Sequence, residues 1–100
     1  MVKHIVMWKL YDSAEGFTKA ENARRMKQEL EKLKAGIPAI QYLEAGINVN
    51  DSEDAFDVVL YAEFESREAL ATYQRHPEHV RFKEFIDGIR SEKRVVDYEV

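Results

Sequence analysis

Apolar and polar residues alternate in four segments of this chain, and a side-chain period of two is that of a β-strand. In the first segment, residues 2–10, one face carries apolar side chains and a histidine: Val2, His4, Val6, Trp8 and Leu10. Residues 40–49 and 56–64 alternate in the same way, and residues 94–100 alternate at the end of the sequence. Four strands are therefore predicted over these ranges.

Two further segments repeat apolar residues at steps of three and four, which predicts amphipathic helices. The first follows Thr18 and Glu21, whose spacing is that of a capping box, and it ends near Gly36. The second divides into a short helix over residues 66–75 and another that starts at Pro77. The residue before a proline avoids helical backbone angles, whereas proline itself suits the first position of a helix.

The predicted order is strand, helix, strand, strand, helix, strand, with residues 11–17 as a loop after the first strand. This β-α-β-β-α-β order predicts an α+β, ferredoxin-like fold with one four-stranded antiparallel sheet and helices on one face. The chain has 100 residues, which is close to the commonest domain size, so residues 1–100 are expected to form a single domain.

Two predicted strands carry apolar side chains on both faces, although this fold leaves one sheet face without a helix. The first strand carries Ile5 and Met7 on the face opposite to Val6 and Trp8, and the third strand carries Val59 and Tyr61 on the face opposite to Val58 and Leu60. An uncovered face of this kind is larger than the apolar patches that monomers usually expose. A second copy packed sheet to sheet would cover it, so we expect a twofold homodimer. A monomer is the alternative, because charged side chains share this face: Lys3, Lys9, Asp57 and Glu63.

Composition narrows the range of functions. The chain carries 15 Lys and Arg residues and 19 Asp and Glu residues, with no dense basic cluster, so nucleic-acid binding is not expected. The absence of cysteine excludes disulfides, thiol nucleophiles and thiolate metal sites. No apolar run approaches the about 20 residues of a membrane span, and the first residues are too charged for a signal peptide. No membrane association and a cytoplasmic location are expected.

Two of the three histidines lie on either side of Pro77. His79 is predicted on the apolar face of its helix, where burial and neighbours tune an imidazole across physiological pH, and it is a candidate general base or acid. The Tyr73 hydroxyl is the candidate partner. The alternatives are a structural histidine bonded to a backbone carbonyl and a core tyrosine whose hydroxyl reaches the surface. His76 is expected to cap the helix that Pro77 starts.

The third histidine, His4, shares a strand face with apolar residues and needs a polar partner if it is buried. Asp97 is the candidate, because the first and last strands are neighbours in this topology. Their register is open, so a pair that lines a ligand pocket and a buried polar pair are both retained. Together with Tyr73 and His79, His4 is expected to line a pocket between helices and sheet. No metal site is expected, since a zinc site needs three or four ligands, and no nucleotide cofactor, since no glycine-rich motif is present.

Several short motifs resemble a known family: Val2-Lys3-His4, Ile37-Pro38, Tyr73 with His76-Pro77-Glu78-His79-Val80, and Val96-Asp97-Tyr98. Over its whole length the chain is similar to the stress-responsive α/β-barrel (Dabb) domain family. The resemblance implies a ferredoxin-like monomer and a homodimer whose two sheets form an α/β barrel. One plant branch of the family cyclises linear polyketides without a cofactor, using a tyrosine and a histidine that match Tyr73 and His79. A third-strand histidine of that branch corresponds to Val58 here.

Two classes of function follow. The first is a small dimeric stress-responsive protein with no assigned reaction, which binds a small apolar ligand or has a structural role. The second is a cofactor-free cyclase or isomerase that transfers a proton between a carbonyl-bearing ligand and the Tyr73–His79 pair. Unpaired ring nitrogens that face a pocket would favour the enzyme. Histidines closed off by backbone partners would favour the structural role.

Overall fold

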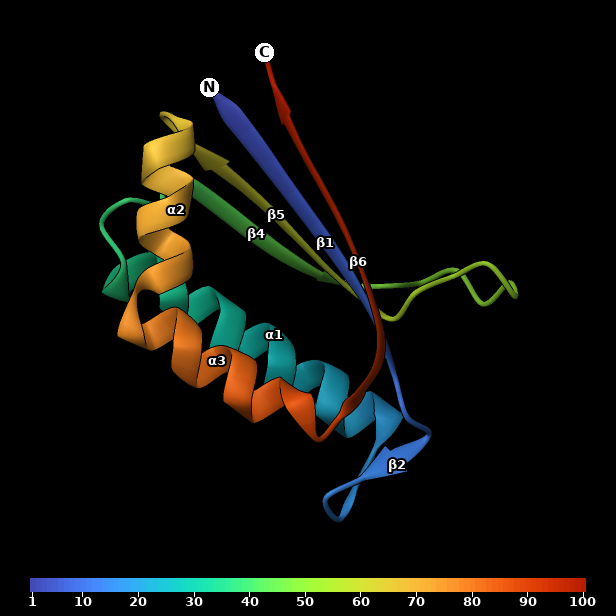
Figure 1. Ribbon diagram of the computed structural model, residues 1–100. Helices are drawn as coiled ribbons and strands as arrows, with labels where there is room; N and C mark the ends of the chain where they lie inside the picture. Colours follow the sequence, from blue (N-terminus) through green and yellow to red (C-terminus); the bar gives the residue numbers. More distant parts are fainter.

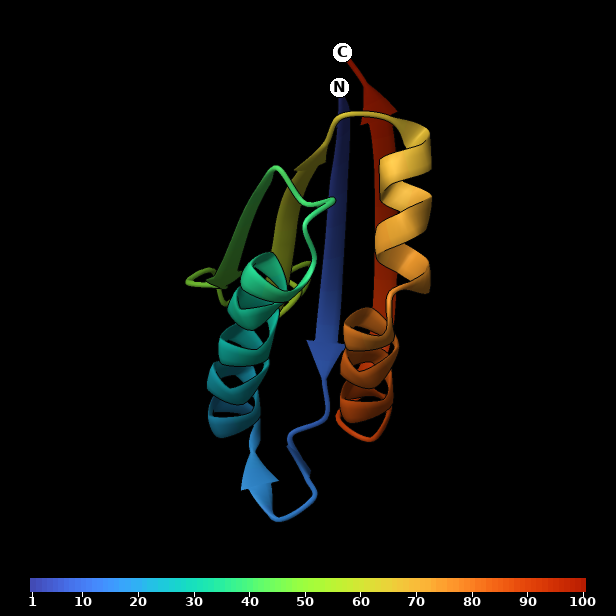
Figure 2. The same ribbon diagram turned by 90° about the vertical axis from the view of Figure 1, so that its left-hand side faces the viewer.

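Four strands form one antiparallel sheet, and three helices cover one of its faces (Figure 1). The computed structural model describes residues 1–100, and the strand order across the sheet is β4-β5-β1-β6. The strands are β1 (Val2–Leu10), β4 (Tyr42–Ile47), β5 (Val58–Phe64) and β6 (Arg90–Glu99). The helices are α1 (Lys19–Gly36), α2 (Arg67–Arg75) and α3 (Pro77–Asp87). The predicted ferredoxin-like fold is confirmed, and Figure 2 shows α1 lying beside α3 on the covered face.

Local capping interactions define the helix starts that the sequence predicts. The Thr18 hydroxyl accepts from the Glu21 backbone N–H at 3.2 Å, and the Glu21 carboxylate accepts from the Thr18 N–H at 2.9 Å. This reciprocal pair satisfies two donors that the first turn of a helix leaves free. At the start of α2 the Ser66 hydroxyl accepts from the Ala69 backbone N–H at 3.1 Å, and Pro77 is the first residue of α3. The predicted break between α2 and α3 is therefore confirmed.

Strands β4 and β5 are shorter than the predicted ranges 40–49 and 56–64, and two larger features depart from the predicted elements. Part of the predicted loop over residues 11–17 contains a small hairpin, β2 (Ser13–Ala14) and β3 (Phe17–Thr18), whose turn residues both have positive φ angles, 55° at Glu15 and 84° at Gly16. A turn of this kind matches the right-handed twist of the strands that it joins. The last strand also begins at Arg90 rather than at residue 94, because it pairs with β1 along that strand's whole length.

The two faces of the sheet differ in burial. The helix side of β1 is almost fully buried, with Val2, His4, Val6, Trp8 and Leu10 each no more than 4% exposed. The opposite face has no helix over it, and apolar side chains on it remain exposed, among them Met7, Val59, Val96 and Tyr98. We call this the open face. None of the helices is both long and apolar enough to cross a membrane.

Candidate functional site

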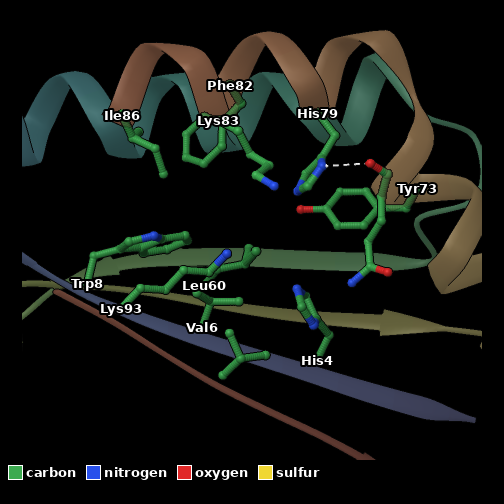
Figure 3. Close-up of a pocket in the computed structure, with 12 residues that line it drawn as sticks. His4, Val6, Trp8, Leu60, Tyr73, His79, Phe82, Lys83, Ile86 and Lys93 are labelled. Carbon is green, nitrogen blue, oxygen red and sulfur yellow. Dashed lines mark hydrogen bonds between the residues drawn. The ribbon is translucent and has the colours of Figure 1, made fainter. Parts of the chain in front are cut away.

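A cavity of about 260 Å³ lies between the sheet and the helices α2 and α3 (Figure 3). Its apolar wall is formed mainly by Val6, Leu60, Phe82 and Ile86. Polar side chains reach it from both layers: His4, Trp8 and Lys93 from the strands, and Tyr73, Gln74, His79 and Lys83 from the helices. The cavity therefore brings together three of the four residues expected at the site, namely His4, Tyr73 and His79.

His79 is oriented by a backbone carbonyl. Its Nδ1 lies 3.1 Å from the carbonyl oxygen of Gln74. A carbonyl oxygen only accepts hydrogen bonds, so in the neutral ring Nδ1 carries the proton and Nε2 keeps its lone pair. Burial lowers the pKa of His79, and the charges of Lys83 and Lys93 add to that effect, while the Gln74 carbonyl acts in the opposite direction. The ring is therefore neutral at neutral pH and offers an unprotonated Nε2.

Tyr73 lies beside His79 at the end of α2. Its side chain is 1% exposed, and its ring packs against those of Phe64 and His79, with centroids 5.0 and 4.5 Å away. Burial alone raises the pKa of the phenol far above its ordinary value of 10.0, so the hydroxyl stays protonated and can donate a hydrogen bond. Figure 3 shows this hydroxyl directed to the same space as the His79 ring.

Asp97 orients the His4 ring through a hydrogen bond on the side away from the cavity. The two residues are direct partners in the pairing of β1 with β6, and Nδ1 of His4 bonds to the Asp97 carboxylate. The carboxylate accepts from Nδ1–H, which leaves Nε2 of His4 on the side of the cavity. The His4 and Tyr73 rings are 5.9 Å apart in an edge-to-face arrangement. Asp97 itself does not line the cavity, and its side chain is 36% exposed.

Two other residues singled out in the sequence lie away from this group. Nδ1 of His76 accepts a hydrogen bond from the Glu78 backbone N–H at 3.1 Å, which confirms its expected role as the cap of α3. Val58 is 1% exposed in β5 and does not line the cavity. No group of three or more His, Asp and Glu side chains is arranged to hold a metal ion.

Four polar residues of the cavity were not anticipated from the sequence, among them Gln74, whose carbonyl oxygen binds His79. Lys83 follows His79 by four residues, a spacing that places two side chains on one helix face, so a signal for it was present. Lys93 is the β6 partner of Trp8, and only the register of the sheet places it there. The indole Nε1 of Trp8 is a fully buried nitrogen without a hydrogen-bond partner. In Figure 3 the Trp8 ring lies at the end of the cavity away from Tyr73, while the Lys83 ammonium group points toward the His79 ring.

Comparison with known proteins adds a family and a set of similar folds. The model of the family described as "Stress responsive A/B Barrel Domain" matches residues 2–100. A stress-response A/B barrel domain-containing protein of Arabidopsis thaliana is 28% identical over 106 aligned positions, which cover 98% of this chain. This chain spans only 36% of the length of that protein.

Solved structures extend the comparison. A dimeric protein of unknown function with a ferredoxin-like fold from Bacteroides fragilis superimposes with a TM-score of 0.87 and 34% identity, covering 99% of this chain and 95% of that one. A hydroxynitrile lyase from Passiflora edulis has a TM-score of 0.82 and 16% identity, with coverage of 99% and 92%. At that identity the likeness to the lyase concerns the fold alone.

Proposed function

The chain belongs to the stress-responsive A/B barrel domain family, and we propose that its cavity binds a small carbonyl-bearing molecule and moves a proton next to the carbonyl. The observation that carries this proposal is the pairing of His79 with Tyr73 at one cavity. The first offers an unprotonated Nε2, and the second offers a protonated hydroxyl. A base and a hydrogen-bond donor at one site are what enolisation of a carbonyl compound requires.

The proposed step moves one proton and shifts two electron pairs. Nε2 of His79 takes a proton from the carbon next to the carbonyl, the electron pair of the broken C–H bond forms a C=C bond, and the π pair of the C=O bond moves onto the oxygen. The Tyr73 hydroxyl donates a hydrogen bond to the developing enolate oxygen. Return of the proton to another carbon gives an isomer, whereas attack of the enolate carbon on a second carbonyl of the same ligand gives a ring. His4, fixed by Asp97, presents a further nitrogen to the same ligand.

Ligand binding without a reaction is the second candidate, and the apolar wall of Val6, Leu60, Phe82 and Ile86 favours it. The two candidate functions, binding and catalysis, depend on different properties of His79. A binding site needs His79 only for its shape, whereas the reaction depends on its Nε2. A variant that keeps the cavity but loses this nitrogen therefore separates them.

A neutral reporter substrate tests for a base in the cavity. When a base removes the C3 proton of 5-nitrobenzisoxazole, the N–O bond breaks and a coloured cyanophenolate forms, so the reaction is followed by absorbance. We expect saturable catalysis by the protein, and a fall of about 10²–10⁴-fold in the His79→Ala variant. His76→Ala is the matched control, because it removes a histidine three residues away that only caps α3. Equal rates for the protein and for His79→Ala would leave ligand binding as the function.

We also propose that the chain is a homodimer formed through the open face. The exposed apolar side chains of Met7, Val59 and Val96 lie on this face, and the similar Bacteroides fragilis protein is described as dimeric. Light scattering at micromolar concentration should give twice the chain mass of 11.7 kDa, and a mass of one chain would contradict the proposal. A cytoplasmic location, expected from the composition, stays a prediction.

A further inference from the structure

Two lysine side chains reach the cavity without an acidic partner. Lys83 extends from the middle of α3 and Lys93 from β6, and no carboxylate lies within 4.0 Å of either ammonium group. The nearby Asp87 is paired with Arg90 at 3.7 Å. Burial lowers the pKa of Lys93, and the charges of Lys83 and Arg90 lower it further, while the Asp87 carboxylate acts in the opposite direction. An anion between the two lysines would relieve this repulsion.

Trp8 adds a directional donor to the cavity wall beside Lys93. Its side chain is 3% exposed, and its indole N–H has no acceptor in the protein. Buried donors are nearly always paired, because an unpaired donor loses its hydrogen bonds to water without replacement. Trp8 faces Lys93 across the β1–β6 pairing, and its ring lies 6.0 Å from that of Phe82. An acceptor oxygen of a bound ligand would give this donor the partner that the protein does not supply.

We infer that the cavity selects small molecules that carry a carboxylate, bound between Lys83, Lys93 and the indole N–H of Trp8. This inference rests on the proposed function, since it names the ligand class of the same cavity. A carboxylate has two acceptor oxygens, which suits two ammonium groups and one N–H donor. Phosphate sites, by contrast, are commonly built from backbone N–H groups at helix N-termini or in glycine-rich turns. Here the donors are side chains in the middle of α3, in β6 and in β1.

The extent of the cavity limits the ligand further. Trp8 and Tyr73 lie at opposite ends of it (Figure 3), and Lys93 is the β6 partner of Trp8. A ligand with its carboxylate at Lys93 and the Trp8 indole would therefore place a carbonyl several bonds away beside His79 and Tyr73. A cavity of about 260 Å³ exceeds the roughly 150 Å³ that holds a benzene molecule in an apolar core. Short keto acids, with or without one ring, fit both limits.

The single tryptophan of the chain provides the readout, because Trp8 lies at the proposed subsite. Hexanoate and hexanamide have the same chain length and differ in charge, and neither absorbs where tryptophan does. We expect hexanoate to change the Trp8 fluorescence saturably and to bind at least roughly tenfold more tightly than hexanamide. Lys83→Gln and Lys93→Gln should each remove most of this preference. Lys34→Gln, which removes a charge at the end of α1, should leave it unchanged.

Four results would overturn the inference: no saturable binding of hexanoate at millimolar concentration, equal binding of hexanoate and hexanamide, tighter binding of butyl phosphate than of hexanoate, or an unchanged preference in both lysine variants. His79→Ala separates this outcome from that of the proposed function. This variant should still prefer hexanoate while it loses the reaction of the neutral reporter substrate. A protein that binds hexanoate but does not accelerate the reporter reaction would keep the carboxylate subsite and refute the base.

Discussion

Replacing Tyr73 with phenylalanine removes one oxygen atom from the cavity and keeps the packed ring. The ring is 1% exposed and contacts the rings of Phe64, His4 and His79. The hydroxyl is the only part that Tyr73→Phe removes, and burial is the only influence on its pKa, with no hydrogen bond contributing. If the hydroxyl donates its hydrogen bond to a ligand and not to a group of the protein, its loss should not lower the free energy of unfolding.

The two possible roles of the hydroxyl predict different changes in stability. A buried hydroxyl without a partner destabilises the folded state by up to about 1–3 kcal/mol, and part of this is recovered in the cavity that it faces. Tyr73→Phe should therefore change the free energy of unfolding by between zero and about +1 kcal/mol, equivalent to a rise in Tm of up to roughly 4–8 °C in a domain of this size. Removing the ring in Tyr73→Ala should instead cost about 3–5 kcal/mol.

Urea denaturation of the protein and both variants, at one protein concentration so that any dimer dissociation is matched, measures these values. The same preparations are then assayed with 5-nitrobenzisoxazole, and Tyr73→Phe should be slower although it is no less stable. A loss of more than 1 kcal/mol in Tyr73→Phe would show that the hydroxyl bonds within the fold. That result would refute the assignment of Tyr73 as a hydrogen-bond donor to a ligand.

Three further predictions concern the site and the assembly. Burial lowers the pKa of His79 in the folded protein, so on acidification the unfolded chain binds a proton at this residue before the folded protein does. The stability that the neutral ring contributes is therefore present above pH 6.5 and is lost as pH falls below that value. The reporter rate should fall in the same range, and His79→Gln should remove the pH dependence of both quantities. Asp97→Ala leaves Nδ1 of the buried His4 without an acceptor and should lower the free energy of unfolding, measured with urea, by ~1–3 kcal/mol. Asp97→Asn retains an acceptor oxygen and should lower it less, so equal losses in the two variants would contradict this role of Asp97. Val96→Asp places a charge on the open face and should halve the mass in light scattering, while Val49→Asp, which is fully exposed, should not.

Local signals in the sequence predicted most of the fold. Thr18 with Glu21, Ser66 and Pro77 each determine a helix start through contacts within a few residues, so their spacing is sufficient. The hairpin at Glu15–Gly16 was missed because only one of its two residues with positive φ is a glycine. The early start of β6 was missed because Arg90-Ser91-Glu92-Lys93 has no apolar alternation, and pairing with β1 alone makes it a strand.

In the candidate site, too, some residues were predicted from local sequence signals and others depend on tertiary contacts. Tyr73 and His79 were predicted from helix periodicity together with the family resemblance, and both line the cavity. The position of Lys93 depends on the register of β6 against β1, which alternation in a single strand does not determine. The unpaired state of the Trp8 indole depends on every atom around it. Lys83 was missed although its spacing from His79 was a local signal, whereas Lys93 and the unpaired Trp8 indole depend on tertiary contacts that the sequence does not show.

The most direct test of a base in this cavity is the ¹⁵N spectrum of the His79 ring at neutral pH, with His79→Gln used to assign its signals. Burial lowers the pKa of His79 and keeps the ring neutral, and the Gln74 carbonyl places its proton on Nδ1 and leaves a lone pair on Nε2. A spectrum of a neutral ring protonated at Nδ1, whose Nε2 signal shifts when hexanoate is added, is the expected result. A ring protonated at Nε2, or charged at neutral pH, would contradict the proposed role of His79.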